Sequence, residues 1–102
     1  MGDNFQIIDR YLMIRLPEEI DHNVSGEISR RADHLMMDQN VSHVVFDFTD
    51  TRFMDSSGIG ILAGRQRRIS CFGGKVYVIN AAERIQRILK MSGVEKVVEI
   101  ME

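Results

Sequence analysis

The chain has 102 residues and is expected to form one domain, residues 1–102. Thirteen Lys and Arg against fifteen Asp and Glu give a formal net charge of −2, which argues against nucleic-acid and membrane-surface binding, because both favour a strongly basic chain. The single cysteine, Cys71, cannot form an internal disulfide, and no apolar run approaches the roughly 20 residues that cross a bilayer. With no signal-peptide pattern at its start, the chain is expected to be a soluble cytoplasmic protein.

Hydrophobic periodicity and turn residues predict elements in the order β-β-α-β-α-β-α-β. The strands are expected at residues 5–8, 11–16, 44–48, 76–79 and 97–100. The helices are expected at residues 23–39, at residues 57–72 and around residues 85–89, the last ending at Gly93. Because strands separated by helices form right-handed parallel crossovers, this order predicts an α/β domain with a mixed, mostly parallel sheet and a leading β-hairpin.

Local features support several of these elements. A tight turn at Asp9–Arg10 is expected to join the first two strands. Asp21 or Asn23 is the expected N-cap of the first helix. The almost unbroken apolar run of residues 44–48 is typical of a strand that is buried on both faces, as in parallel sheets.

Residues 53–64, with the sequence Phe-Met-Asp-Ser-Ser-Gly-Ile-Gly-Ile-Leu-Ala-Gly, carry most of the functional information. They join a buried strand to a helix, and ligands and partners of α/β sheets gather at the carboxyl ends of strands. The simplest interpretation is structural: Asp55 or Ser56 caps the helix, and the glycines allow close packing on the sheet. Of the two, Ser56 is expected to be the cap with its side chain turned inward, which leaves the hydroxyl of Ser57 accessible.

Two chemical interpretations of this segment, and a metal site elsewhere in the chain, fail on spacing. Gly58–Ala63 matches the dinucleotide pattern G-x-G-x-x-G/A, but about nine residues separate it from the strand, and Asn80 stands where the acidic ribose partner belongs. A serine hydrolase needs G-x-S-x-G and a downstream histidine, whereas every histidine precedes Ser57. The histidines and Cys71 lack the spacing of metal ligands, so neither a metal nor a cofactor is expected.

A helical wheel divides residues 57–72 into two arcs. The arc expected to face the core carries Ile59, Leu62, Ala63, Gln66 and Ile69. The arc expected to face solvent carries Ser57, Ile61, Gly64, Arg65 and Arg68. Arginine beside an apolar side chain is typical of a partner-binding patch, although exposed apolar side chains and solvated arginines are also common without a partner.

Three motifs together resemble the bacterial anti-sigma factor antagonists of the STAS family: Phe53–Gly60, Glu19–His22 upstream, and Lys90–Val94 near the end. The predicted order of elements is similar too, and the likeness covers nearly the whole chain. In the sporulation-type members the second serine of D-S-S-G is phosphorylated by the anti-sigma factor, which is itself a serine kinase. That position is Ser57 in this chain.

Individual positions follow the family pattern unevenly. Asp21 and Asp55 match the family's acidic residues around the phosphoserine. Glu18 stands where the family usually has a glycine before its E-[LI]-D-H motif. The sequence stops at Glu102, where many members continue into another amphipathic helix, and whether it is a complete short member or a truncated one is left open.

The resemblance implies a binding protein, not an enzyme. Its unphosphorylated form is expected to bind an anti-sigma factor and free a sigma factor; the anti-sigma factor then uses ATP and Mg²⁺ to phosphorylate Ser57, and a serine phosphatase reverses the modification. The free protein is expected to be a monomer. Partner contacts are expected at Asp21, His22, Asp55, Ser56, Ser57, Gly58, Ile61, Arg65 and Arg68. Two alternatives stay open, a sensory or scaffold STAS domain of a stress-signalling assembly and a small-ligand binder that uses the same loop.

Overall fold

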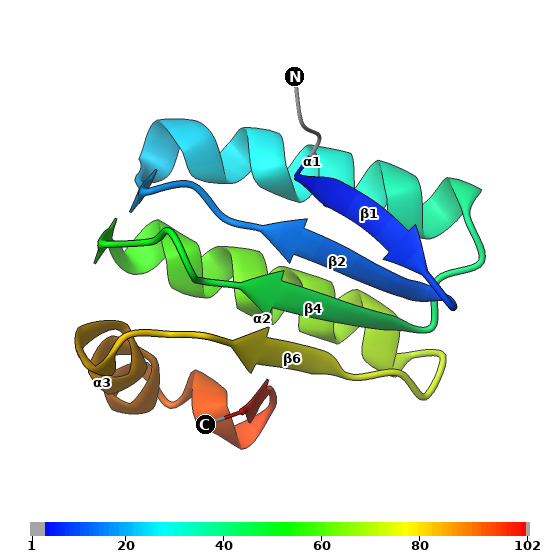
Figure 1. Ribbon diagram of the computed structural model, residues 1–102. Helices are drawn as coiled ribbons and strands as arrows, with labels where there is room; N and C mark the ends of the chain where they lie inside the picture. Colours follow the sequence, from blue (N-terminus) through cyan, green and yellow to red (C-terminus); the bar gives the residue numbers. More distant parts are fainter. Residues whose placement is uncertain (1–3, 102) are drawn as a thin grey trace.

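The computed structural model describes residues 4–101, and its centre is a five-stranded sheet in the order β1-β2-β4-β6-β7 (Figure 1). These strands are β1 (Phe5–Ile8), β2 (Tyr11–Arg15), β4 (His43–Asp47), β6 (Val76–Ile79) and β7 (Glu99–Ile100). β1 pairs antiparallel with β2, and the remaining neighbours pair in parallel. The predicted mixed sheet with a leading hairpin is confirmed.

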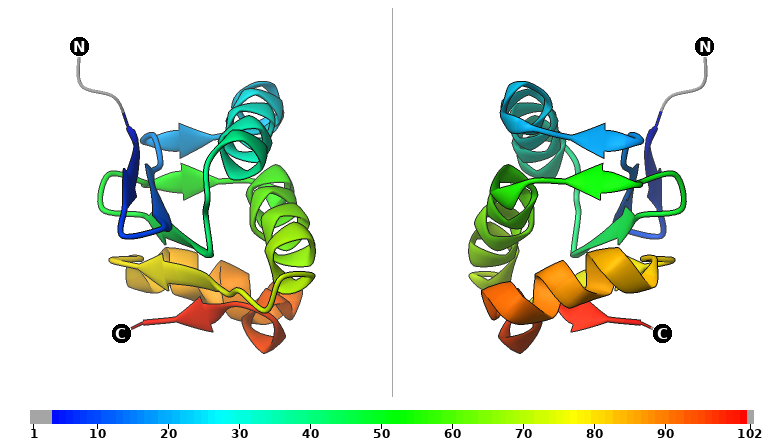
Figure 2. Two further views of the ribbon diagram at one scale, coloured as in Figure 1. Left: turned by 90° about the vertical axis from the view of Figure 1, so that its right-hand side faces the viewer. Right: turned by 90° about the vertical axis from the view of Figure 1, so that its left-hand side faces the viewer.

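Three α-helices connect these strands: α1 (His22–Asp38), α2 (Ser56–Ser70) and α3 (Glu83–Ser92). α1 and α2 lie side by side over one face of the sheet, as the two side views show (Figure 2). Within residues 4–101, none of the helices is both long and apolar enough to cross a membrane.

The first hairpin turns as tightly as predicted. Asp9 and Arg10 both have positive φ, 51° and 71°. Positive φ at both central positions is the geometry of a type I′ turn, whose twist matches that of the flanking strands. The turn usually takes Asn-Gly, so an arginine at its second position adopts a backbone conformation that side chains disfavour.

The core lies between the sheet and the two long helices. β2 alternates as predicted, with Leu12 and Ile14 turned into the core. In β4, Val44 and Phe46 on one face and Val45 on the other are all buried, which confirms a strand covered on both sides.

The structure differs from the sequence prediction in two segments. No element is predicted between the strand at residues 44–48 and the helix at residues 57–72, but this segment contains the two-residue strand β5 (Phe53–Met54), which pairs with another short strand, β3 (Glu19–Ile20). The last strand is shorter than residues 97–100, because the 3-10 helix η1 (Val94–Lys96) follows α3 and only the last two of those residues pair with β6. Elements of two or three residues are too short for a hydrophobic period to reveal.

Candidate functional site

The small sheet formed by β3 and β5 brings two distant motifs together. The strands are parallel, with Ile20 opposite Met54, and the backbone N–H of Asp55 donates to the carbonyl of Ile20 over 3.1 Å. Asp21 and Asp55 therefore follow directly after paired residues, and each one precedes a helix. As a result α1 and α2 begin at the same end of the molecule (Figure 1).

Each of these aspartates caps its helix. Asp21 accepts a hydrogen bond of 3.0 Å from the backbone N–H of Val24, which selects Asp21 over Asn23 as the cap of α1. Asp55 Oδ1 accepts one of 2.8 Å from the backbone N–H of Ser57. A side-chain acceptor at this position satisfies a helix N–H that has no partner within the helix.

The expectation that Ser56 caps α2 is therefore wrong. Asp55 is the cap, and Ser56 is the first helical residue, with an exposed side chain. Ser57 is half-buried, and its hydroxyl donates a short hydrogen bond to Asp55 Oδ1, the same atom that accepts from the Ser57 backbone. The carboxylate thus holds both polar groups of Ser57 in place.

Asp55 is kept ionised by its neighbours. The hydrogen bond from the Ser57 hydroxyl, together with that from the Ser57 backbone, lowers the pKa of the Asp55 carboxyl. Hydrogen bonding from the backbone of His22, at the start of α1, and the charge of a protonated His22 imidazole lower this pKa further. The Asp55 carboxylate therefore interacts with the first turns of both helices.

Gly58 allows this close arrangement. A Cβ at this position would lie 2.4 Å from Cγ and Sδ of Met54 and 3.5 Å from a methyl group of Ile20. The absence of a side chain thus lets the first turn of α2 pack directly on the paired strands. This buried position explains the glycine of D-S-S-G by packing.

The predicted solvent arc of α2 is wrong for two of its members. Ile61 is only 1% exposed and lies in the core, and Arg65 is 7% exposed. The Nε atom of Arg65 lies 2.8 Å from Asp33 Oδ1 on α1. Burial lowers the pKa of this guanidinium, and the negative charge of Asp33 offsets part of that effect. The wheel failed because α2 packs on α1 as well as on the sheet, so its buried face includes an arginine neutralised by a neighbouring helix.

Arg68 remains exposed but stands far from the phosphoacceptor candidate. Eleven residues of helix separate it from Ser57, about 16 Å along the axis. Its Nε atom lies 3.3 Å from the same Asp33 carboxylate. The structure therefore brings together the expected partner residues of the two motifs, Asp21–His22 and Asp55–Gly58, and leaves the arginines outside this group.

The surface beside this group includes two residues that the sequence analysis did not single out, Gly60 and Phe53, and one that it placed on the solvent arc, Gly64. Gly60 is exposed and Gly64 half-buried, and a Cβ at either position would meet no atom within 4 Å. Phe53, on β5, is 55% exposed. Open glycines on a helix let another protein approach its backbone closely. The wheel placed Gly64 toward solvent, whereas the exposure of Gly60 could be known only once the buried face of α2 was known. Among residues 4–101, no group of His, Cys, Asp or Glu side chains is placed to hold a metal ion.

Comparisons with known proteins agree with this arrangement. The model of the STAS domain family matches residues 4–102. An anti-sigma F factor antagonist from Paenibacillus polymyxa is 34% identical over 89 residues, which are 87% of this chain and 76% of that protein. The anti-sigma-B factor antagonist of Bacillus subtilis (strain 168) is 24% identical, over 80% of this chain and 81% of its own length.

Solved structures show the same fold. The unphosphorylated form of the anti-sigma factor antagonist SpoIIAA superposes with a TM-score of 0.85, over 96% of this chain and 86% of that one, at 24% sequence identity. The phosphorylated form of SpoIIAA, described as a Bacillus cell fate determinant, gives a TM-score of 0.76 over 96% and 89% of the two chains, also at 24% identity. With the matches in sequence, this likeness means that the chain belongs to the STAS domain family.

Proposed function

We propose that this protein is an anti-sigma factor antagonist: it binds an anti-sigma factor and so frees the sigma factor that the anti-sigma factor holds. The names of its relatives support this role, since they are antagonists of anti-sigma factors. The single structural observation that carries the proposal is the bond between Ser57 and Asp55 at the adjoining starts of α1 and α2. The proposed activity is binding, and the chain itself catalyses no reaction in it.

The proposal assigns the regulatory phosphate to Ser57. The anti-sigma factor acts as a serine kinase with ATP and Mg²⁺, the phosphoprotein no longer binds it, and a serine phosphatase restores the active form. Supporting this, Ser57 occupies the second serine of D-S-S-G, and its hydroxyl lies in the first turn of a helix, where the helix dipole favours a phosphate group. SpoIIAA, which shares the fold, has been solved in unphosphorylated and phosphorylated forms.

The docking face follows from the observed burial of α2. Ile61 and Arg65 face inward, so the partner meets the opposite side of the helix, where Ser56 and Gly60 are exposed. His22, exposed at the start of α1, extends this face across the small sheet. A partner can approach the α2 backbone closely here because the glycine leaves the surface open.

Phosphorylation by the cognate anti-sigma kinase tests the proposal. Intact-mass analysis after incubation with the kinase and ATP should show one added phosphate on the wild type and on Ser56→Ala, and none on Ser57→Ala. Peptide mapping should place the phosphate on Ser57. A phosphate on Ser56 would contradict the proposal. Binding to the anti-sigma factor that releases no sigma factor would also contradict it, and would favour a scaffold role.

A further inference from the structure

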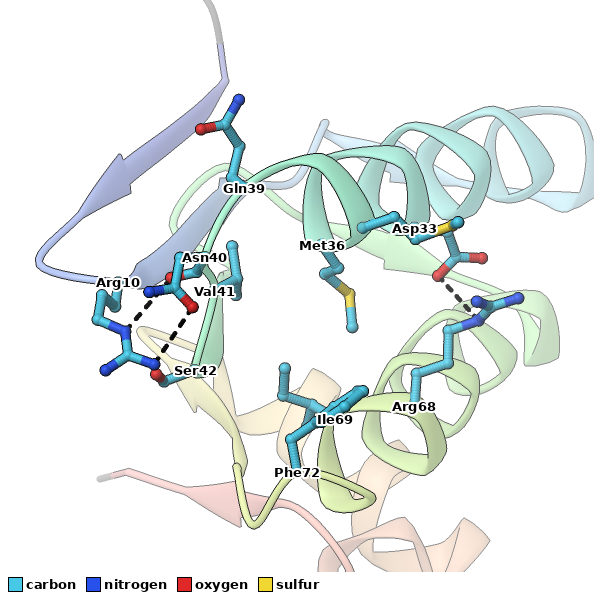
Figure 3. Close-up of a pocket in the computed structure, with 11 residues that line it drawn as sticks. Arg10, Asp33, Met36, Gln39, Asn40, Val41, Ser42, Arg68, Ile69 and Phe72 are labelled. Atoms are coloured by element: carbon cyan, nitrogen blue, oxygen red, sulfur yellow. Dashed lines mark hydrogen bonds and ion pairs between the residues drawn. The ribbon is translucent and has the colours of Figure 1, made fainter.

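A groove of about 460 Å³ opens at the other end of the long helices, between the last turns of α1 and α2 (Figure 3). Its apolar side chains are Met36 and Met37 from α1, Ile69 from the last turn of α2, Phe72 from the turn that follows α2, and Val41 from the segment before β4. Met36 points from α1 toward Ile69 and Phe72 (Figure 3). The groove is remote from Ser57, because α2 is 15 residues long, or about 20 Å.

Two large apolar side chains of this groove are unusually exposed. Phe72 is 85% exposed and Met37 is 77% exposed. One exposed apolar side chain is ordinary, but these two line the same groove as the less exposed Met36 and the buried Ile69, so several large apolar side chains are gathered at one place. Aromatic residues, Met and Arg are the types enriched where proteins bind each other, and the unbranched Met side chain adapts to different surfaces.

The charge of the groove is positive. Arg10 and Arg68 stand at its two ends (Figure 3). Asp33 is the one carboxylate among the lining residues, and its Oδ1 atom already lies 2.8 Å from Arg65 and 3.3 Å from Arg68. Arg10 contacts the carbonyl and side-chain oxygens of Asn40 and, within residues 4–101, no carboxylate. An occupant with negative charge would complement these guanidinium groups.

The position of Arg10 supports a role for its charge. Its φ of 71° is a conformation in which glycine is relaxed and a side chain is strained. The hairpin would turn at least as well with glycine there. Arginine at this position, in place of glycine, puts a guanidinium group at the edge of the groove.

We propose that this groove binds an amphipathic helix of another protein, one that presents apolar side chains about one turn apart and an acidic side chain beside them. α1 and α2 lie side by side, and a third helix can fill the groove between two such helices. The apolar face of the bound helix would cover Met36, Ile69 and Phe72. Its carboxylates would face Arg10 and Arg68. This second binding surface does not depend on the proposed role of Ser57.

A peptide-display library tests this proposal. Helical peptides of about four turns are selected on the wild-type protein after depletion on the double variant Phe72→Ser, Met37→Ser. We expect the recovered sequences to share apolar positions at helical spacing with Asp or Glu beside them. Both substituted side chains are exposed, so the double variant should keep its fold, which its melting temperature verifies.

Binding of one recovered peptide is then measured by fluorescence anisotropy. We expect affinity to fall about tenfold or more in the double variant and in Arg10→Glu. The matched controls Met91→Ser, at another highly exposed methionine on α3, and Ser57→Asp should bind like the wild type. Recovery of basic peptides, recovery of none, or equal binding to the Arg10→Glu variant would overturn the proposal. Dimerisation of the wild type that the double variant abolishes would overturn it too, since the occupant would then be a second copy.

Discussion

At the scale of single residues, the carboxylate of Asp55 has two tasks that sequence alone would assign to different residues. It caps α2 by accepting a hydrogen bond from the backbone N–H of Ser57, and it accepts a second hydrogen bond from the hydroxyl of the same serine. A phosphate on Ser57 abolishes the second interaction, because the modified oxygen has no proton to donate. The modified group then lies next to a carboxylate of the same sign.

The pKa of Asp55 should report this bond. In Ser57→Ala the hydroxyl donor is lost while the backbone donor stays, so the pKa of Asp55 should rise from its lowered value. A carboxyl with a lowered folded-state pKa stabilises the protein above its unfolded-state pKa and loses that contribution as the pH falls through the folded-state pKa. With Ser57→Ala this loss should therefore be complete at a higher pH.

A carboxyl-carbon NMR titration measures this change directly. Ser56→Ala is the control, because within the described residues no hydrogen bond joins the Ser56 side chain to Asp55, and its titration should match that of the wild type. An unchanged pKa of Asp55 in Ser57→Ala would mean that the hydroxyl bond is not formed in solution.

At the scale of elements, one side of α2 packs in the core and the opposite side is the one proposed to bind the partner. Ile61→Ala removes a side chain that is 1% exposed, so it should lower the free energy of unfolding by about 2–5 kcal/mol, as core truncations do. Gly60→Arg adds an exposed side chain where a Cβ meets no atom within 4 Å, and arginine favours helix, so stability should not fall. This variant should instead weaken binding to the anti-sigma factor.

Urea unfolding and titration with the anti-sigma factor separate the two effects. If Ile61→Ala kept wild-type stability and lost binding, while Gly60→Arg kept full affinity, the faces of α2 would be assigned the wrong way round.

The sequence predicted the long elements well because their periods extend over several residues. The alternation of Leu12 and Ile14, and the end of α3 at Gly93, appear in the structure as expected. The orientation of α2 could not be predicted, because an arginine on its buried face contradicts the hydrophobic pattern unless Asp33 of α1 is known to face it. The joined starts of α1 and α2 were implied by the family resemblance, which places Asp21 and Asp55 around one serine, but the hydrophobic pattern could not show them, since they depend on pairing between two two-residue strands.

At the scale of the whole molecule, α2 links two surfaces that lie about 20 Å apart, the end that carries the proposed phosphoacceptor Ser57 and the groove. Between them, Arg65 is held by Asp33 and buried, so it cannot turn toward a phosphate on Ser57. The negative charge of a modified Ser57 therefore stays local and is not neutralised by the arginines of the helix.

The proposed switch should consequently act by local repulsion, without refolding. Phosphoserine adds about −1.5 to −2 charge, and at a helix N-terminus negative charge is favourable by about 0.3–1 kcal/mol, so the domain should stay folded. Ser57→Asp should shift the melting temperature by less than about 8 °C, in line with that free energy for a domain of this size. When the anti-sigma factor binds, the same charge beside Asp55 would be buried without a partner, which costs about 2–5 kcal/mol and lowers affinity more than tenfold.

Calorimetric titration should show this loss of affinity for Ser57→Asp and full affinity for Ser57→Ala. Tight binding by Ser57→Asp, or backbone amide shifts spread over the whole sheet in the phosphoprotein, would contradict local repulsion.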